Sequence, residues 1–519
     1  MGTGLQAAGR TRTLMALWVT AVGVAWVGQR ILFDSSPGLG WGLWTALASG
    51  GLVAFTHGTR GRPGKTLLTL LALACILAFG ATFTAAESAF ALIFLSVTML
   101  LSIAMLLAPD DGPGRLTVWL AILAPPVAAA RALYETALRM GEAAQLLGDR
   151  KSVPLVRGAL LTLPVVIAFA LLLAGADPTF AGWRDSIAAA LSSWVIVPRL
   201  VFFALLLVMT LGAFSFAVRN APLPRPTLAG VLPAGAAPVL RIGGTERAML
   251  LGSVAALFAV FLALQVSYFF GNAPAIAGSG VTYAEFARRG FGELSLVATG
   301  CTALMVLLDL LAARGARERI IRGVQLVLVG EMLLLLMSAF RRVSLYEAAY
   351  GFTTARLYAQ AYMVVMAVVL GVLTLEILRG LDVNRLVMRS VFAGTLAFTG
   401  LTYWNHEGWI ATKNIDRLRA TGRVDLRYLT QQLSPNATPA IVRALPSLPP
   451  APAAMIRECL TSRYAGWGSG DRDEWYEWNL ARARARRALA KAGIPSSSAR
   501  SQYSHTSRAL CQAGQRSFS

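Results

Sequence analysis

Charge is scarce in this chain. Of its 519 residues, 14% are charged and 56% are hydrophobic, whereas soluble domains carry about 25% charged residues. This composition excludes an ordinary soluble protein. Histidine and cysteine are also rare, with three histidines and four cysteines, and neither type has the spacing of metal ligands. We therefore predict neither a zinc site nor an iron–sulfur site.

The motifs of well-known soluble enzymes are missing as well. The sequence contains no Walker A loop, no dinucleotide fingerprint, no nucleophile elbow and no His-Glu-x-x-His helix. It thus indicates no catalytic residue and no cofactor, and it favours a protein that is not an enzyme. The net charge of +21 is better explained by basic residues at the ends of membrane spans than by nucleic-acid binding.

Long apolar stretches are what the chain has in abundance. About 20 apolar residues cross a hydrocarbon core that is about 30 Å thick. We therefore predict an all-α fold: a polytopic helical membrane protein with about 11 transmembrane helices and a small, mostly helical extramembrane C-terminal region. The predicted spans are 13–32, 38–56, 66–84, 88–108, 156–175, 196–217, 246–270, 293–312, 320–340, 357–377 and 386–404.

One further apolar stretch, residues 116–130, is short and contains Pro125 and Pro126. Its length favours a re-entrant or interfacial segment over a span. If it does not span, most basic residues outside the tail fall on one side of the membrane, as the positive-inside rule requires; if it spans, they do not. We therefore place the N-terminus in the cytoplasm and the C-terminal tail outside.

These spans divide the chain into five parts. Residues 1–217 form an N-terminal membrane part of six spans, within which 109–155 is a cytoplasmic segment, either an amphipathic interfacial helix or a plain connector. A Pro- and Gly-rich linker, 218–245, leads to the five spans of 246–404. Residues 405–494 form an extracytoplasmic tail domain, in which Trp475, Trp478 and Leu480 are expected to pack inward. Residues 495–519 are Ser- and Gln-rich, and we expect them to be disordered.

Glu331 is the one ionisable residue near the middle of a predicted span. An acidic residue at this depth costs about 2.5–3.5 kcal/mol on insertion scales. It must therefore be protonated, paired or in contact with water. A proton or cation relay in a transporter is one interpretation, and a structural hydrogen bond to a neighbouring helix is the other.

Three polar, aromatic runs adjoin the predicted spans and fall on the outer side under the eleven-span arrangement. They begin at Tyr283, at Arg341 and at Asn405. Tyr and Trp prefer headgroup depth, and Arg pairs with phosphate or carboxylate. The candidate functional cluster taken from these runs is Tyr283, Glu285, Arg288, Arg289, Arg341, Arg342, Tyr346, Glu347, Tyr350, Arg356, Asn405 and Asn414.

The same three runs carry a family resemblance. They are similar to a Tyr-Ala-Glu-Tyr-x-Arg-x-Gly-Phe run, a Tyr-Glu-x-x-Tyr-Gly-x-Thr-x-x-Arg run and an Asn-x-x-x-x-Ile-Ala-x-x-Asn-Ile run. Phe286 and the pair Thr412-Lys413 depart from the usual pattern. Over residues 245–490 the chain resembles uncharacterised bacterial membrane proteins with DUF4153 or DUF4173 domains, DUF4173 more closely. The resemblance implies no assigned activity, so no catalytic residue is carried over.

Three functions remain open at this point. The first is a non-enzymatic, envelope-associated accessory or scaffold protein, whose outer cluster either braces the spans against the tail or forms a cleft. If it forms a cleft, the partner that binds there is an anionic lipid headgroup, an envelope precursor or another envelope protein. The alternatives are a transporter that uses Glu331 and an envelope enzyme that acts on a lipid-linked substrate through Glu285, Glu347 or Glu407. Cys459 and Cys511 can pair if the tail is outside.

Overall fold

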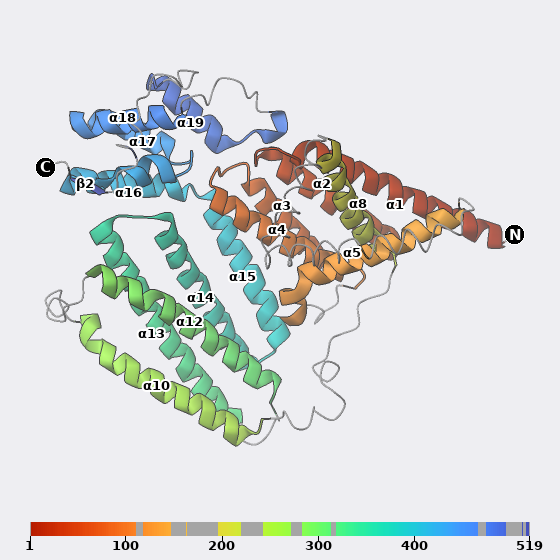
Figure 1. Ribbon diagram of the computed structural model, residues 1–519. Coiled ribbons are helices and arrows are strands. Elements are labelled where there is room, and N and C mark those ends of the chain that lie inside the picture. Colours follow the sequence, from red (N-terminus) through yellow and green to blue (C-terminus); the bar gives the residue numbers. More distant parts are fainter. Residues whose placement is uncertain are drawn as a thin grey trace, which may run out of the picture. The chain divides into compact units, whose positions relative to one another are not determined.

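The structure is a computed structural model that describes residues 2–110, 118–146, 162, 196–219, 242–270, 283–312, 318–464, 474–494, 511 and 515–517. These residues are almost entirely helical (Figure 1). They divide into two compact units, of which unit 1 comprises 1–224 with 472–480, and unit 2 comprises 225–471 with 481–519. The all-α fold expected of a polytopic membrane protein is confirmed.

Unit 1 is a bundle of apolar helices in which the first and last described spans are antiparallel. The ring of Phe33, which follows the first helix, lies 5.6 Å from that of Phe202 near the start of the last helix. Further along, Thr210 Oγ1 donates to the carbonyl oxygen of Ala21 at 3.4 Å. The helices are α1 (Gly2–Leu32), α2 (Leu39–Arg60), α3 (Lys65–Gly80), α4 (Glu87–Leu107), α5 (Val118–Leu146) and α8 (Ile196–Val218).

A short segment from the C-terminal tail, residues 474–480, completes one end of unit 1. Its Leu480 N–H donates to Thr82 O at 2.7 Å, and Trp478 O accepts from Leu39 N at 3.1 Å. Asn479 Nδ2 donates to the carbonyl oxygens of Ala81 and Thr84, both at 2.8 Å. The segment therefore binds the α1–α2 and α3–α4 connections together. Because the α3–α4 connection lies at this end, α4 begins here, and residue 110 beyond its far end lies at the opposite end of unit 1. The contact between Phe33 and Phe202 places the start of α8, and with it residue 196, at this end as well.

Pro125 and Pro126 both lie inside α5, which continues without a break from Val118 to Leu146. The re-entrant or interfacial placement of 116–130 stays a prediction. Gly212 makes the crossing with α8 possible, because a Cβ atom there would overlap the backbone of Ala132. Tertiary packing along α8 thus compensates for the backbone hydrogen bonds that the prolines remove.

Unit 2 contains five consecutive long helices, α10 (Gly244–Phe270), α12 (Tyr283–Leu310), α13 (Glu318–Tyr350), α14 (Thr354–Arg379) and α15 (Val383–Tyr403), drawn in green and cyan in Figure 1. Buried ion pairs join the ends that are remote from the tail. Arg247, which is 1% exposed, contacts Asp309 and Glu318, each at 3.2 Å. On the neighbouring hairpin, the fully buried Glu376 pairs with Arg385 at 2.8 Å and also with Arg389.

Among the residues that the structure describes, eight helices are long and apolar enough to cross a membrane by length and composition. They coincide with eight of the predicted spans. The span predicted at 66–84 is the shorter helix α3, and that at 386–404 is α15, whose first two turns carry Asn384, Arg385 and Arg389. The span predicted at 156–175 and the linker 218–245 lie largely outside the described residues, so the count of eleven stays a prediction.

The tail region of unit 2 folds around its own apolar core, which includes Ile410, Leu429, Ile456 and Leu460. Leu489 packs into the same core from the following helix. The elements are α16 (His406–Thr421), β1 (Arg423–Asp425), a π-helical turn (Tyr428–Gln432), α17 (Thr438–Ala444), α18 (Pro450–Tyr464), α19 (Leu480–Lys491) and β2 (Gln515–Ser517). Two short 3-10 turns, Leu445–Ser447 and Trp475–Glu477, join them.

One expectation about the tail is wrong. Trp475 and Trp478 do not pack inward: their exposed fractions are 63% and 47%, and Tyr476 between them is buried instead. The expected disorder of 495–519 stays a prediction. Of this segment the structure describes Cys511, which forms a disulfide with Cys459, and residues 515–517, which pair with β1.

Candidate functional site

Two of the three polar runs meet at one place in unit 2. The run from Arg341 forms the end of α13, the turn 351–353 and the start of α14, and the run from Asn405 forms α16, which packs against that turn. The run from Tyr283 begins α12, but its side chains at Tyr283, Glu285, Arg288 and Arg289 lie outside the described part of the structure. Their expected role stays a prediction.

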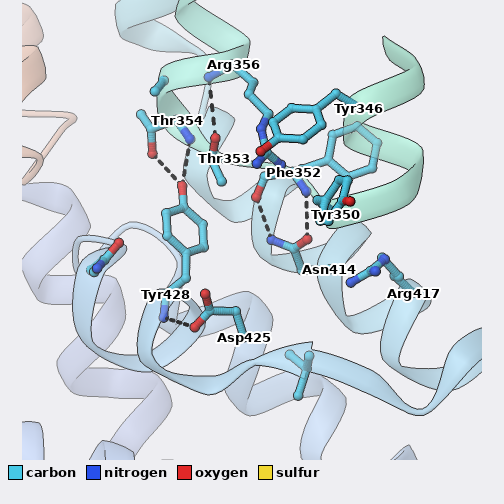
Figure 2. Close-up of a pocket in the computed structure, with 13 residues that line it drawn as sticks. Tyr346, Tyr350, Phe352, Thr353, Thr354, Arg356, Asn414, Arg417, Asp425 and Tyr428 are labelled. Carbon is cyan, nitrogen blue, oxygen red and sulfur yellow. Dashed lines mark hydrogen bonds between the residues drawn. The ribbon is translucent and has the colours of Figure 1, made fainter. Parts of the chain in front are cut away.

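Asn414 fastens α16 to the turn between α13 and α14. Its Oδ1 accepts from Phe352 N and its Nδ2 donates to Phe352 O, both at 2.8 Å (Figure 2). The preceding Gly351 has φ +90° and brings its backbone close to the Asn414 side chain, where a Cβ atom would not fit. One turn later on α16, Arg417 Nη2 donates to Ala349 O at 2.6 Å. The tail thereby satisfies backbone groups that the end of α13 leaves unpaired.

Tyr428 makes the second connection between the tail and the membrane helices. Its hydroxyl oxygen accepts from Thr354 N at 2.6 Å and lies 2.8 Å from Thr354 Oγ1 (Figure 2). Asp425 Oδ1 accepts from the backbone N–H of Tyr428 at 2.9 Å and so holds the turn that carries the ring. Thr353 caps α14 by accepting from Arg356 N at 3.4 Å.

These contacts surround a cavity of about 660 Å³, a size typical of small-molecule sites. Four residues of the predicted cluster line it: Tyr346, Tyr350, Arg356 and Asn414. The other lining residues are Phe352, Thr353, Thr354, Ala355, Arg417, Val424, Asp425, Tyr428 and Gln432. Figure 2 shows the aromatic rings and arginine side chains around this space.

The cavity carries an excess of positive charge. The guanidinium of Arg356 lies 4.1 Å from the ring centre of Tyr346 and donates to Gly351 O. Burial and the neighbouring Arg423 and Arg356 lower the pKa of Arg417, yet an arginine stays protonated in proteins. Against these two lining arginines stands one lining carboxylate, that of Asp425. The arrangement is therefore suited to an anion.

Other residues of the predicted cluster have structural partners near the cavity. Asn405 caps α16 by accepting from Gly408 N at 3.0 Å and donates to Asn436 O at 3.1 Å. Glu347 is 3% exposed and accepts from Gln360 Nε2 at 2.8 Å. Arg341 and Arg342 lie on α13 and do not line the cavity.

Glu331 lies 15 residues before Tyr346 on α13, about 22 Å along the helix, and it too does not line the cavity. It is 9% exposed, among the buried residues of α12 and α13, with Met332 next to it in the core of unit 2. Among the described residues, no three His, Cys, Asp or Glu side chains lie together as a metal site would require.

Among the cavity residues that were not anticipated from the sequence are Arg417, Asp425 and Tyr428. Arg417 was detectable in principle, since it stands three residues after Asn414 and shares its helix face. Asp425 and Tyr428 follow α16 in a stretch without a distinctive pattern. Only the fold brings them to the turn at 351–353.

Glu407 is a buried acid in the tail next to this site. It is 3% exposed, and its carboxylate accepts from Ser434 Oγ and from Ser434 N. Burial raises the pKa of Glu407 above its ordinary value, while Ser434, His406 and Arg463 oppose the shift. The carboxyl therefore anchors the loop at 434–436 to the start of α16.

We expect Asn414→Ala to loosen the turn at 351–353. The change removes two hydrogen bonds and leaves both backbone groups of Phe352 without their partner, which costs about 2–3 kcal/mol. Hydrogen exchange of the full chain in detergent should show more than a tenfold loss of protection at Phe352. The control is Thr412→Ala on the same helix, whose hydroxyl donates to its own helix at Gly408 O. Equal protection in both variants would contradict the fastening role of Asn414.

The tail should lose stability as the pH rises through the raised pKa of Glu407. A carboxyl whose folded-state pKa exceeds its unfolded-state value stabilises the fold below the unfolded value and loses this contribution above the folded one. Hydrogen exchange of residues 405–438, corrected for intrinsic rates, should therefore quicken as the pH rises above about 4.5. Glu407→Gln should flatten this profile, and Asp416→Asn, exposed on the same helix, should not. A pH-independent wild type would refute the assignment.

A family model matches most of the chain. The model is described as a domain of unknown function (DUF4153) and covers residues 14–444. The match begins much earlier in the chain than the resemblance seen in the sequence and ends at 444 instead of 490; it includes both membrane parts and all three polar runs. The closer likeness to DUF4173 stays a prediction. No curated protein and no solved structure matches. The chain, a helical protein with several apolar membrane-type helices and a pocketed tail, belongs to the DUF4153 family.

Proposed function

We propose that this protein is a non-enzymatic, envelope-associated membrane protein whose outward-facing cavity binds the phosphate of an anionic lipid headgroup. One observation carries the proposal: Arg356 and Arg417 line a single cavity where α13 ends and α14 begins, and the lining has one carboxylate, that of Asp425. Arginine recognises phosphate through paired N–H donors. Tyr346 and Tyr350, whose ring centres are 4.8 Å apart, add an apolar wall.

The position of the cavity at the end of a long helix supports a lipid as the source of the phosphate. Helix α13 has 33 residues and is about 50 Å long, so it extends well beyond a hydrocarbon core of about 30 Å. Three aromatic residues at this end are exposed, Tyr350 by 37%, Tyr403 by 39% and Trp404 by 45%. Exposed Tyr and Trp are typical of the headgroup layer. The cavity therefore lies where headgroups reach it.

Two observations support a cavity that opens on the outer side of the membrane: the distribution of basic residues and the disulfide of the tail. The positive-inside rule places the start of α10 and the end of α14 in the cytoplasm, and the tail is at the opposite end of unit 2. The Cys459–Cys511 disulfide supports the same orientation, because disulfides persist in oxidising compartments outside the cytoplasm. On this basis we assign the protein to a bacterial inner membrane, with the N-terminus inside and the tail outside.

The composition of the cavity favours binding over catalysis. Its lining has one carboxylate, and Asp425 already uses an oxygen to hold Tyr428 N. Glu347 and Glu407, two of the three acids considered for an envelope enzyme, are paired with Gln360 and Ser434 outside the lining. A transporter that uses Glu331 remains the second candidate. It is favoured by Glu331 Oε2, which is buried without a hydrogen-bond partner among the described residues.

The orientation is testable by a fusion at residue 420, which follows the last predicted span. Alkaline phosphatase is active only when it is exported, so the fusion should be active in a bacterial host. A second fusion at residue 62, between α2 and α3, should be expressed and inactive. An inactive, expressed fusion at 420 would reverse the orientation and remove the basis for an outward-facing cavity.

Arg417→Gln should weaken binding of an anionic lipid about tenfold or more. A hydrogen bond to a charged group contributes about 1.5–3 kcal/mol, and 1.4 kcal/mol corresponds to a tenfold change in Kd. The measurement is the Kd of purified full-length protein for dioctanoyl-phosphatidylglycerol. Arg417→Lys keeps the charge and should recover part of the loss.

Arg419→Gln is the matched control, because Arg419 lies on the same helix, pairs with the exposed Asp416 and does not line the cavity. It should leave the Kd unchanged. Dioctanoyl-phosphatidylcholine tests whether net charge matters, and inorganic phosphate tests whether the lipid is needed. Equal Kd values for wild type and Arg417→Gln would refute the proposal, and tight binding of phosphate alone would replace the lipid with a soluble anion.

A further inference from the structure

One wall of the cavity, residues 423–432, is held by two elements from much later in the sequence. Strand β2 pairs antiparallel with β1, with Arg516 opposite Val424. Helix α18 holds the turn that follows, since Cys459 O accepts from Gln431 Nε2 at 3.2 Å and Arg463 Nη1 donates to Thr430 O at 2.7 Å. The wall depends on both contacts for its position.

The Cys459–Cys511 disulfide joins these two elements covalently. Cys459 lies on α18, and Cys511 stands four residues before the start of β2. Both cysteines are buried, with exposed fractions of 2% and 3%. The bond therefore fixes β2 next to the helix that holds the other half of the wall.

The strand pair needs such a link. A two-stranded ladder of three residues is marginal by itself in water. Without Cys511, the nearest preceding residue that packs into the tail core, among those described, is Ile494, 21 residues before Gln515. Effective concentration falls as about the −3/2 power of tether length, so lengthening the tether from four to 21 residues weakens the pairing about tenfold.

The position of β1 affects the shape of the cavity through a short series of contacts. Val424 and Asp425 of β1 line the cavity directly. Asp425 Oδ1 accepts from Tyr428 N at 2.9 Å, and the Tyr428 hydroxyl accepts from Thr354 N at 2.6 Å on the opposite wall. Displacement of β1 therefore changes both sides of the site.

We propose that the Cys459–Cys511 disulfide is a redox latch on the cavity, which has its binding form when the disulfide is closed and loses it when the disulfide is reduced. The effect on a lipid ligand rests on the proposed function, whereas the effect on the wall does not. A latch of this kind keeps the site inactive in a chain whose tail has not yet reached an oxidising compartment.

Closure of the latch is a thiol–disulfide exchange with an oxidised dithiol protein outside the cytoplasm. The thiolate of one cysteine attacks a sulfur of the partner's disulfide, forming a mixed disulfide and releasing one partner thiolate. The second cysteine then displaces the other partner sulfur. The two cysteines of the tail are oxidised to one disulfide, the partner's disulfide is reduced to two thiols, and two protons pass from the tail to the partner.

The test compares oxidised and reduced forms of the full-length protein in detergent. Cys75 and Cys301, the two free cysteines, are replaced by alanine, so that Cys459 and Cys511 are the two cysteines that remain. Hydrogen exchange of residues 423–432 is measured with and without a phosphine reductant, and mass spectrometry verifies the redox state. Reduction should lower the protection of β1 about tenfold, leave α10 and α12 unchanged, and raise the Kd for dioctanoyl-phosphatidylglycerol.

The double variant Cys459→Ser/Cys511→Ser should resemble the reduced protein and should not respond to the reductant. Unchanged protection of β1 after verified reduction would overturn the latch, and so would free thiols at both positions in protein isolated from an oxidising compartment. If β1 responds to reduction while the oxidised protein binds no anionic lipid, the latch stands and the proposed function fails.

Discussion

The structure of the site depends on the break between α13 and α14 at residues 351–353. A chain that reverses direction there leaves backbone donors and acceptors without helical partners, and such groups are costly wherever water is limited. Asn414, Arg417 and Tyr428 of the tail supply the missing partners. The polar side chains that brace the turn also enclose a space lined by two arginines, so the bracing contacts and the proposed binding site share residues.

Much of the fold was predictable because membrane helices are recognisable in a sequence by their length and apolar composition. The eight apolar helices and the helical tail follow from local sequence. The form of α5 was not specified, because the sequence left a re-entrant segment, an interfacial helix and a plain connector open, and the packing of Gly212 against Ala132 is a long-range contact. Asp425 and Tyr428 were not predicted as site residues. Long-range contacts place them in the site, and such contacts leave no periodic pattern in the sequence.

The charges of unit 2 are distributed unequally between its two ends. At the end remote from the tail, Arg247 and Glu376 are buried and neutralised by partners on neighbouring helices. Such pairs join α10, α12, α13, α14 and α15 through groups that neutralise one another. At the tail end, the lining arginines of the cavity outnumber the lining acid. The ion pairs at the first end therefore have a structural role, whereas the arginines at the tail end face a cavity.

The docking of residues 474–480 onto unit 1 has a consequence for biogenesis. The segment ties the α1–α2 and α3–α4 connections by backbone hydrogen bonds, yet it is made only after every membrane helix has been translated. The earliest helices must therefore persist in an unfinished state during the synthesis of nearly the whole chain.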